Sequence, residues 1–241
     1  AMTAACTAGS TNTTGREWIS NVTVGAEGGQ TMSGDSGAST YSDYTMDAAR
    51  QITLYANSAN NTISVSKAWA STKYNEGIVV WIDFNRSGTF ESNEIILQSN
   101  ASQTTPIGPQ TFAVPATSYI GDKPVRMRVS MRFNSNVASP CGNFTFGEVE
   151  DYAVYIPSVL AVSENTKDSQ IQVYPNPAKD VLNVSKVSDR ATYVIHSVSG
   201  QMISRGNISE GKVNVSKLQK GVYVISIDDN GNKTNVKFVK E

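Results

Sequence analysis

The chain has 241 residues, of which 20 are basic, 21 are acidic and one is histidine, so its formal net charge is −1. A charge so close to zero excludes a nucleic-acid binder that works by neutralising phosphates. A single histidine argues against a histidine-rich zinc site or a histidine-dependent catalytic triad. No run of about 20 apolar residues is present, so we expect no membrane span.

The composition changes near residue 157. Residues 1–157 carry 9 basic and 13 acidic side chains, whereas residues 158–241 carry 11 basic and 8 acidic ones, which gives net charges of −4 and +3. Both cysteines, all three tryptophans and 16 of the 20 aromatic residues lie in the first part. The polar segment 158–170 lacks a strand pattern, and we interpret it as a linker. We therefore predict a first domain over residues 1–157 and a second over residues 171–241.

Strand signals fill the first domain, and long helical periodicities are absent. Residues 125–133 alternate apolar and polar side chains almost without error. This alternation predicts a strand with one face in a core and the other in water. In chain order, the expected strands are Glu17–Val24, Gln51–Ala56, Thr62–Ala70, Gly77–Asp83, Glu94–Gln98, Gln110–Val114, Val125–Phe133 and Val149–Ile156.

The local motif that points most directly to chemistry is the segment 83–94, Asp-Phe-Asn-Arg-Ser-Gly-Thr-Phe-Glu-Ser-Asn-Glu. It fits the D-x-[DNS]-x-[DNS]-G-x5-E spacing of a twelve-residue calcium loop, in which oxygens at positions one, three and five turn inward together. Because serine replaces a second aspartate at position five, we expect weak binding, on the order of 10⁻⁴–10⁻³ M. The alternative is a polar hairpin turn without an ion. The expected calcium ligands are Asp83, Asn85, Ser87, Thr89 and Glu94.

A second acidic group consists of Glu148, Glu150 and Asp151. Three carboxylates within four residues repel one another unless a cation or a basic partner is near. Strand alternation places Glu148 and Glu150 on one face and Asp151 on the other. One interpretation is a cation shared with Asp43 or Asp47. The other, which we prefer, is pairing with the arginines of the strand before: Arg126, Arg128 and Arg132.

Aromatic residues surround the predicted turn at residues 71–77. Exposed rings there would stack on sugar rings, and Trp69 and Tyr74 are the candidates. We expect Trp81 in the core, because it lies within an apolar strand. Tyr41 and Tyr44 flank Asp43 and either pack against the sheet or shape a shallow site.

The second domain has seven shorter strand signals, which predict a β-sandwich. They are Ile171–Tyr174, Val181–Ser185, Ala191–His196, Met202–Asn207, Lys212–Val215, Val222–Ile227 and Thr234–Lys240. The turn at residues 229–232 contains Asn-Gly, which favours a hairpin. The predicted fold class is therefore all-β, with two β-sandwiches, the larger one jelly-roll or immunoglobulin-like.

The segment 146–152, Phe-Gly-Glu-Val-Glu-Asp-Tyr, resembles the motif that names the GEVED domain. Other parts of that family's pattern occur in order, at Cys6, Glu17–Ile19, Tyr41–Thr45, Val80–Asn85, Arg126–Val129 and Pro140–Gly142. The resemblance covers about residues 4–157. It implies a non-catalytic domain of a secreted bacterial protein, often found beside a hydrolase domain.

Residues 171–241 resemble the C-terminal sorting domain of type IX secretion, which is known from Bacteroidetes. The residues that carry the resemblance are Val173–Pro177, Ser199–Gln201, Leu218–Tyr223 and Val236–Lys240. It implies a smaller, seven-stranded immunoglobulin-like sandwich that the outer-membrane translocon recognises. It also implies later removal of this domain, with a cut in or near residues 158–170. For an exported protein, an oxidising compartment also predicts a disulfide between Cys6 and Cys141.

The leading hypothesis is a calcium-stabilised accessory module that binds a glycan or a protein, works beside an upstream catalytic domain and is joined to a secretion signal. A structural spacer or adhesin unit is a second hypothesis. A small hydrolase that pairs Asp43 or Asp47 with Glu148 or Glu150 is a third. The absence of a nucleophile elbow or a metalloprotease motif argues against the hydrolase.

Overall fold

The structure is a computed structural model that describes residues 1–12, 16–158 and 171–241. The chain forms two compact units, Ala1–Ile156 and Pro157–Glu241. Apart from two short 3-10 helices, η1 (Ala48–Arg50) and η2 (Ser92–Glu94), every regular element of the described residues is a strand. The predicted all-β class is confirmed. No helix of the described chain is long and apolar enough to cross a membrane.

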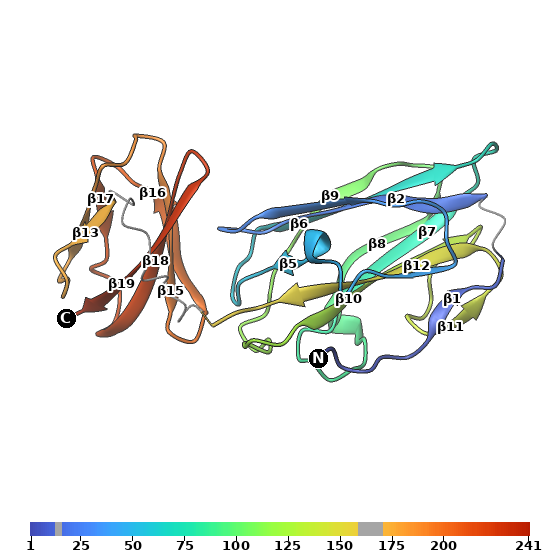
Figure 1. The fold of residues 1–241 in the computed structure, drawn as a ribbon, viewed down its shortest axis with the longest axis horizontal. Helices are drawn as coiled ribbons and strands as arrows, with labels where there is room; N and C mark the ends of the chain where they lie inside the picture. Colours follow the sequence, from blue (N-terminus) through green and yellow to red (C-terminus); the bar gives the residue numbers. More distant parts are fainter. Residues whose placement is uncertain (13–15, 159–170) are drawn as a thin grey trace. The chain divides into compact units, whose positions relative to one another are not determined.

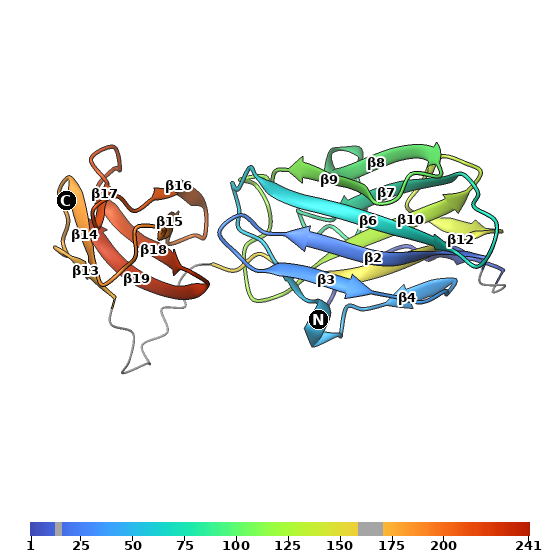
Figure 2. The same cartoon turned by 90° about the horizontal axis from the view of Figure 1, so that it is seen from above.

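Two sheets form the sandwich of the first unit (Figure 1). The smaller sheet has four antiparallel strands, which lie side by side in Figure 2. Their order is β3 (Thr31–Asp35), β2 (Glu17–Gly25), β6 (Asn61–Trp69) and β9 (Ile107–Phe112). The alternating burial along β6 reflects the period of two that the sequence shows there.

The larger sheet has six strands, and β12 (Gly147–Tyr155) organises one side of it. The antiparallel strands follow in the order β12, β10 (Val125–Phe133), β7 (Glu76–Ile82) and β8 (Ile95–Ser102). Two short strands, β4 (Tyr41–Asp43) and β5 (Ile52–Thr53), pair with β12 in parallel, one near each end. The apolar core lies between the two sheets.

The outer face of the larger sheet is shielded from solvent at the middle of β10. Arg128 and Ser130 lie on that face of β10 with exposed fractions of only 2% and 1%. The expectation that one face of residues 125–133 lies in water is therefore wrong. The reason is that the N-terminal segment crosses this face, where β1 (Ala8–Ser10) pairs in parallel with β11 (Gly142–Phe144).

The second unit is a sandwich of seven strands, and each predicted strand has its counterpart. One sheet consists of β13 (Gln172–Tyr174), β14 (Val181–Ser185) and β17 (Lys212–Asn214). The other has the order β16 (Met202–Asn207), β15 (Thr192–Ser197), β18 (Gly221–Asp229) and β19 (Asn232–Lys240). The β18–β19 turn places Asn230 and Gly231 at φ of 53° and 88°, the left-handed conformation that glycine and asparagine tolerate.

The sequence patterns miss four strands of the first unit: β1, β3, β4 and β11. All four are short and rich in glycine, serine or aspartate, residues that are depleted in strands. The predicted strand Gln51–Ala56 shrinks to the two residues of β5. Most of the predicted linker, residues 159–170, lies outside the described residues.

Candidate functional site

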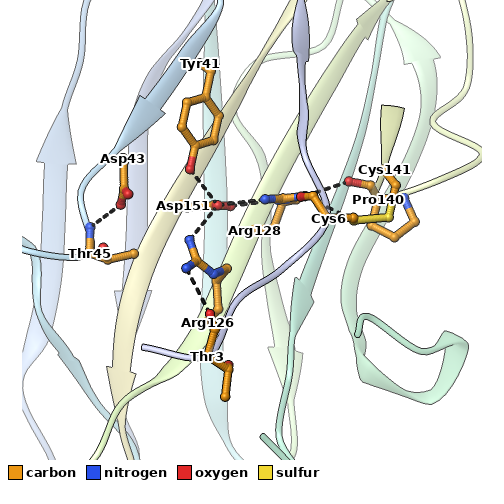
Figure 3. Close-up of polar contacts among 10 residues, drawn as sticks. All are labelled: Thr3, Cys6, Tyr41, Asp43, Thr45, Arg126, Arg128, Pro140, Cys141 and Asp151. Atoms are coloured by element: carbon orange, nitrogen blue, oxygen red, sulfur yellow. Dashed lines mark hydrogen bonds and ion pairs between the residues drawn. A yellow bond between two sulfur atoms is a disulfide. The ribbon is translucent and has the colours of Figure 1, made fainter. Parts of the chain in front are cut away.

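Asp151 lies at the centre of a buried ion-pair cluster on the outer face of the larger sheet (Figure 3). Arg128 is its cross-strand neighbour on β10 and donates from Nε to Oδ1 and from Nη2 to Oδ2, both at 2.8 Å. Arg126, two residues earlier on the same face, donates from Nη1 to Oδ2 at 2.8 Å. The preferred interpretation, that this acidic group pairs with the arginines of β10, is thus confirmed for Asp151.

Tyr41 completes the cluster from β4. Its hydroxyl donates to Oδ2 of Asp151 at 2.9 Å. Burial and the neighbouring charge of Asp151 raise the pKa of the Tyr41 hydroxyl to about 12, so the phenol remains a donor at physiological pH. Asp151 therefore accepts bonds from two guanidinium groups and one hydroxyl.

A disulfide joins Cys6 to Cys141, as predicted, with the two Cα atoms 5.6 Å apart. It fixes the N-terminal segment directly over the ion-pair cluster. Nη1 of Arg128 donates to the carbonyl oxygens of Cys6 and Pro140 at 2.8 and 2.9 Å. Nη2 of Arg126 likewise donates to the carbonyl oxygen of Thr3 at 3.2 Å. The arginines thus connect the sheet, the disulfide and the N-terminal segment.

A pocket of about 470 Å³ opens beside this cluster. Its lining combines polar and apolar groups and holds charges of both signs. Asp43 contributes an exposed carboxylate whose Oδ1 accepts a bond from the Thr45 amide. Asp43 and Asp151 occupy paired positions on the parallel strands β4 and β12. The lining consists of residues 4–10 with Tyr41, Asp43, Arg126, Arg128, Asn143 and Asp151. Tyr41 was expected either to pack against the sheet or to shape a shallow site, and it lines this pocket. Asn143 was not predicted, since it lies in a strand that the sequence patterns miss.

Glu148 and Glu150 lie on the opposite face of β12, inside the sandwich, and both are fully buried. Glu148 accepts bonds from the Ile19 amide at 2.7 Å and the Ser39 hydroxyl at 2.6 Å, and Glu150 accepts one from the Tyr152 hydroxyl at 2.7 Å. Burial raises the pKa of both carboxyls, that of Glu148 to about 7. The interpretation that Asp43, Glu148, Glu150 and Asp151 share one cation is wrong, because the pleat of β12 separates them.

The predicted calcium loop connects β7 to η2 and β8, so it lies between strands as expected. Asp83 is buried, and its carboxylate accepts the amides of Ser87 and Gly88 at 2.9 and 2.8 Å. Gly88 has a φ of 85°, and a Cβ there would lie 2.7 Å from the carbonyl oxygen of Ala4. The bend therefore requires glycine for its conformation and for its contact with the N-terminal segment.

Side-chain and main-chain oxygen atoms lie close together in this loop. The Ser87 hydroxyl lies 3.4 Å from Oδ1 of Asp83 and 3.3 Å from the carbonyl oxygen of Thr89. The side-chain oxygen of Asn85 accepts the Ser87 amide at 2.8 Å. Each of the five predicted ligands thus carries an oxygen atom, the kind of ligand atom that calcium prefers, and Ser87 lies at the middle of the loop.

Glu94 closes the loop through η2. Its carboxylate accepts the Glu91 amide at 2.9 Å and reaches the amide of Asn85 at 3.5 Å. Burial, followed by the charges of Asp83 and Glu91, raises the pKa of Glu94. Within the described part of the chain, neither Asp83 nor Glu94 forms an ion pair, and no group of three or more His, Cys, Asp or Glu is arranged to hold a metal.

The three predicted ligand aromatics lie in different surroundings, and all are half-buried. Tyr44 packs against Tyr152 with ring centroids 5.4 Å apart, and Arg50 covers its ring at 3.9 Å. Trp69 donates from Nε1 to Glu76 at 3.4 Å, and the amino groups of two lysines lie 5.7–5.9 Å from its ring.

Tyr74 packs edge-on against Phe133 at 4.9 Å. Phe133 pairs with Glu76, the acceptor of the Trp69 indole. Trp69 and Tyr74 therefore lie around the same residue pair, whereas Tyr44 belongs to the core-facing side of β12.

Two family matches cover much of the chain. Residues 77–155 match the GEVED domain, and residues 172–241 match the secretion system C-terminal sorting domain. The second match marks the chain for export by type IX secretion, to the cell surface or into the medium, and implies interaction with that machinery.

Individual known proteins are similar to the chain over a short segment or at low sequence identity. Over 58 residues the chain is 40% identical to Beta-agarase D of Zobellia galactanivorans, in a match that covers 24% of this chain and 12% of that protein. Domains 3 and 4 of rat CD4 match at 9% identity over 78% of this chain and 99% of that chain, with a TM-score of 0.24. PorZ, a surface component of the type IX secretion system of Porphyromonas gingivalis, matches at 12% identity over 76% of this chain and 35% of that chain, with a TM-score of 0.27.

Proposed function

Because the chain carries a GEVED domain followed by a type IX sorting domain, we propose that residues 1–157 form a non-catalytic accessory module of a secreted or surface-attached bacterial protein. The module binds a glycan or a protein on behalf of a catalytic domain that lies upstream in a longer protein. The sorting domain is recognised by the translocon and then removed by a cut near residues 158–170. The order of the two domains carries this proposal, and the short similarity to an agarase agrees with it.

The positions of the carboxylates favour this role over hydrolysis. The proposed hydrolase pairs use Glu148 or Glu150, and both side chains are fully buried inside the sandwich. Asp151 is held by two arginines and a tyrosine. A general acid and a general base must both reach the substrate. The carboxylates named in the hydrolase hypothesis do not meet that requirement.

The pocket beside Asp151 is better suited to binding a ligand than to hydrolysing one. Its lining combines the exposed carboxylate of Asp43, the amide of Asn143 and main-chain groups of residues 4–10, which suit hydroxyl-rich ligands. A spacer unit would need no such pocket. We therefore place the glycan or protein ligand there.

Calcium in the loop 83–94 would serve stability and the shape of this site. Asp83, Asn85, Ser87, Thr89 and Glu94 would hold it. When bound, calcium would offset the two buried carboxylates that have no basic partner in the described chain. The loop contacts residue 4 at the edge of the pocket, so a rigid loop would also hold the pocket wall.

Thermal unfolding of the full chain tests the calcium proposal. After exhaustive chelation the melting temperature should fall, and calcium should restore it, whereas Asp83→Asn should lose the response. Asp122→Asn, at an exposed position outside the loop, is the matched control and should respond like the parent chain. A metal-free parent chain with no calcium response would rule out the site.

Ligand binding is tested with a glycan array probed by the full chain, with and without calcium. Asn143→Ala removes an exposed pocket side chain with little risk to the fold and should weaken the positive spots. Binding that Asn143→Ala leaves unchanged would place the ligand elsewhere.

A further inference from the structure

Arg132 stands apart from the other two arginines on the outer face of β10. Arg126 and Arg128 share the carboxylate of Asp151, whereas Arg132 forms no ion pair with any described residue. Its Nη2 donates to the carbonyl oxygen of Ser139 at 3.3 Å, and its buried Nε has no hydrogen-bond partner. A guanidinium is always charged in proteins, so this arginine presents a cation that the described part of the chain leaves without an anion.

A second pocket, of about 340 Å³, opens at this arginine. It lies where the end of β10 meets the segment that joins β11 to β12 (strand labels in Figure 1). Among the described residues, no acidic side chain lines it. Three phenyl rings, one guanidinium and two hydroxyl groups do, from Arg132, Phe133, Ser135, Phe144, Thr145 and Phe146.

The rings of this pocket are held in place. Phe133 packs edge-on against Phe146 at 5.4 Å and against Tyr74 at 4.9 Å. The Phe133 amide also donates to the carbonyl oxygen of Phe146 at 3.3 Å, which ties the two lining segments together. A ligand would therefore meet a preformed surface and would order few side chains on binding.

Cations lie over two of the rings. The guanidinium of Arg132 lies 4.5 Å from the centroid of Phe144, and that of Arg16 lies 5.6 Å from Phe146. Arg16 is exposed and precedes the buried Glu17 of β2, whose pKa is raised by burial and lowered to a lesser extent by the charge of Arg16. Burial lowers the pKa of Arg132, which means that its guanidinium has lost part of its hydration. An anion that reaches Arg132 would form paired charge-assisted hydrogen bonds with the guanidinium and would so compensate for the lost hydration.

We propose that this pocket, the Arg132 pocket, binds an acidic sugar unit of a polysaccharide, with its sulfate or carboxylate on the Arg132 guanidinium and its ring face on the phenyl rings. The exposed hydroxyls of Ser135 and Thr145 form hydrogen bonds with the hydroxyl groups of the sugar. A volume near the lower end of the range for ligand pockets suits one sugar ring of a longer chain. The inference rests on the proposed glycan-binding role and gives it a ligand class and a second position.

Calorimetric titration of the full chain tests this proposal with three oligosaccharides of equal length: a sulfated galactan, a polyuronate and neutral agarose. We expect the chain to bind at least one acidic probe, with affinity that falls as salt rises. Arg132→Met keeps the apolar stem but removes the charge, and should weaken that binding about tenfold or more. Arg132→Lys keeps the charge but loses the planar fork, and should give an intermediate affinity.

Two further variants guard against a folding artefact. Thr145→Trp starts from an exposed position and should block the pocket while the melting temperature stays unchanged. Arg190→Met removes the same charge from an exposed site in the second unit and should leave binding intact. Binding of neutral agarose alone, untouched by Arg132→Met, would overturn the inference while leaving the glycan-binding role standing. Binding of none of the three probes would count against both.

Discussion

Arg128 and Asp151 meet in a two-point ion pair at the centre of the larger sheet, with both contacts at 2.8 Å and both side chains almost completely buried. The pair lies beneath the disulfide, and the same guanidinium also holds the carbonyl oxygen of Cys6. One carboxylate of the GEVED motif therefore fixes how the N-terminal segment lies on the sheet.

Asp151→Asn should destabilise the first unit by roughly 3–5 kcal/mol, because it leaves the buried guanidinium of Arg128 and the half-buried one of Arg126 without their anion. Urea unfolding followed by tryptophan fluorescence measures this unit selectively, since all three tryptophans lie within it. Asp43→Asn is the matched control at the paired, exposed position on β4 and should change stability by less than about 0.5 kcal/mol. Equal effects of the two substitutions would contradict the structural role of Asp151.

The disulfide closes a loop of well over one hundred residues, with a sequence separation of 135. Loop entropy then gives it a contribution of up to about 4–5 kcal/mol in the chain-entropy model. The double variant Cys6→Ser, Cys141→Ser should lower the melting temperature, and a reducing agent should lower that of the parent chain but not of the variant. A parent chain indifferent to reduction would show that the bridge adds little.

Two buried glutamates should make the first unit less stable as the pH rises. Burial raises the pKa values of Glu76 and Glu148 to about 7, from ordinary values near 4.5. Because the folded state holds these protons more tightly than the unfolded chain, their contribution is complete below about pH 4.5 and is lost as the pH rises to about 7.

Glu148→Gln removes one of these titrations and should flatten the dependence of stability on pH in this window. Glu210→Gln, in the second unit, is the control and should leave the tryptophan-detected curve unchanged. A parent curve that rises between pH 4.5 and 7 would contradict the assignment.

His196 gives the second unit the opposite trend. It is buried in β15, and burial lowers its pKa to about 4 because the interior disfavours the imidazolium. The unfolded chain binds this proton more tightly, so stability is complete above about pH 6.5 and is lost as the pH falls towards 4. As the sole histidine, His196 can be titrated by NMR without ambiguity. A measured pKa near 6.5 would show that the ring is open to water.

Period-two patterns were sufficient to predict the seven strands of the second unit and the long strands of the first. They also predicted that Glu148 and Glu150 share a face. A period of two does not say which face meets the core, and here both glutamates face it, held by the Ile19 amide, the Ser39 hydroxyl and the Tyr152 hydroxyl.

The Asp151 cluster and the Arg132 pocket depend on contacts between residues far apart in the sequence, which no local sequence pattern predicts. The parallel pairing of β4 with β12 brings Tyr41 to Asp151 across 110 residues. The Arg132 pocket joins the ends of β10 and β11 through packing of aromatic rings. The proposed calcium loop, in contrast, is contiguous in sequence, so its candidate ligands can be named from the sequence alone, and calcium binding there stays a prediction.

Export of the chain tests the central claim, that an accessory module is joined to a type IX sorting domain. The full chain and a version that ends at residue 158 would be produced with the same periplasmic leader in a bacterium with an active type IX system. The full chain should reach the surface or the medium and lose its sorting domain. The shortened chain should remain in the periplasm, folded and disulfide-bonded. Equal export of both versions would contradict the account.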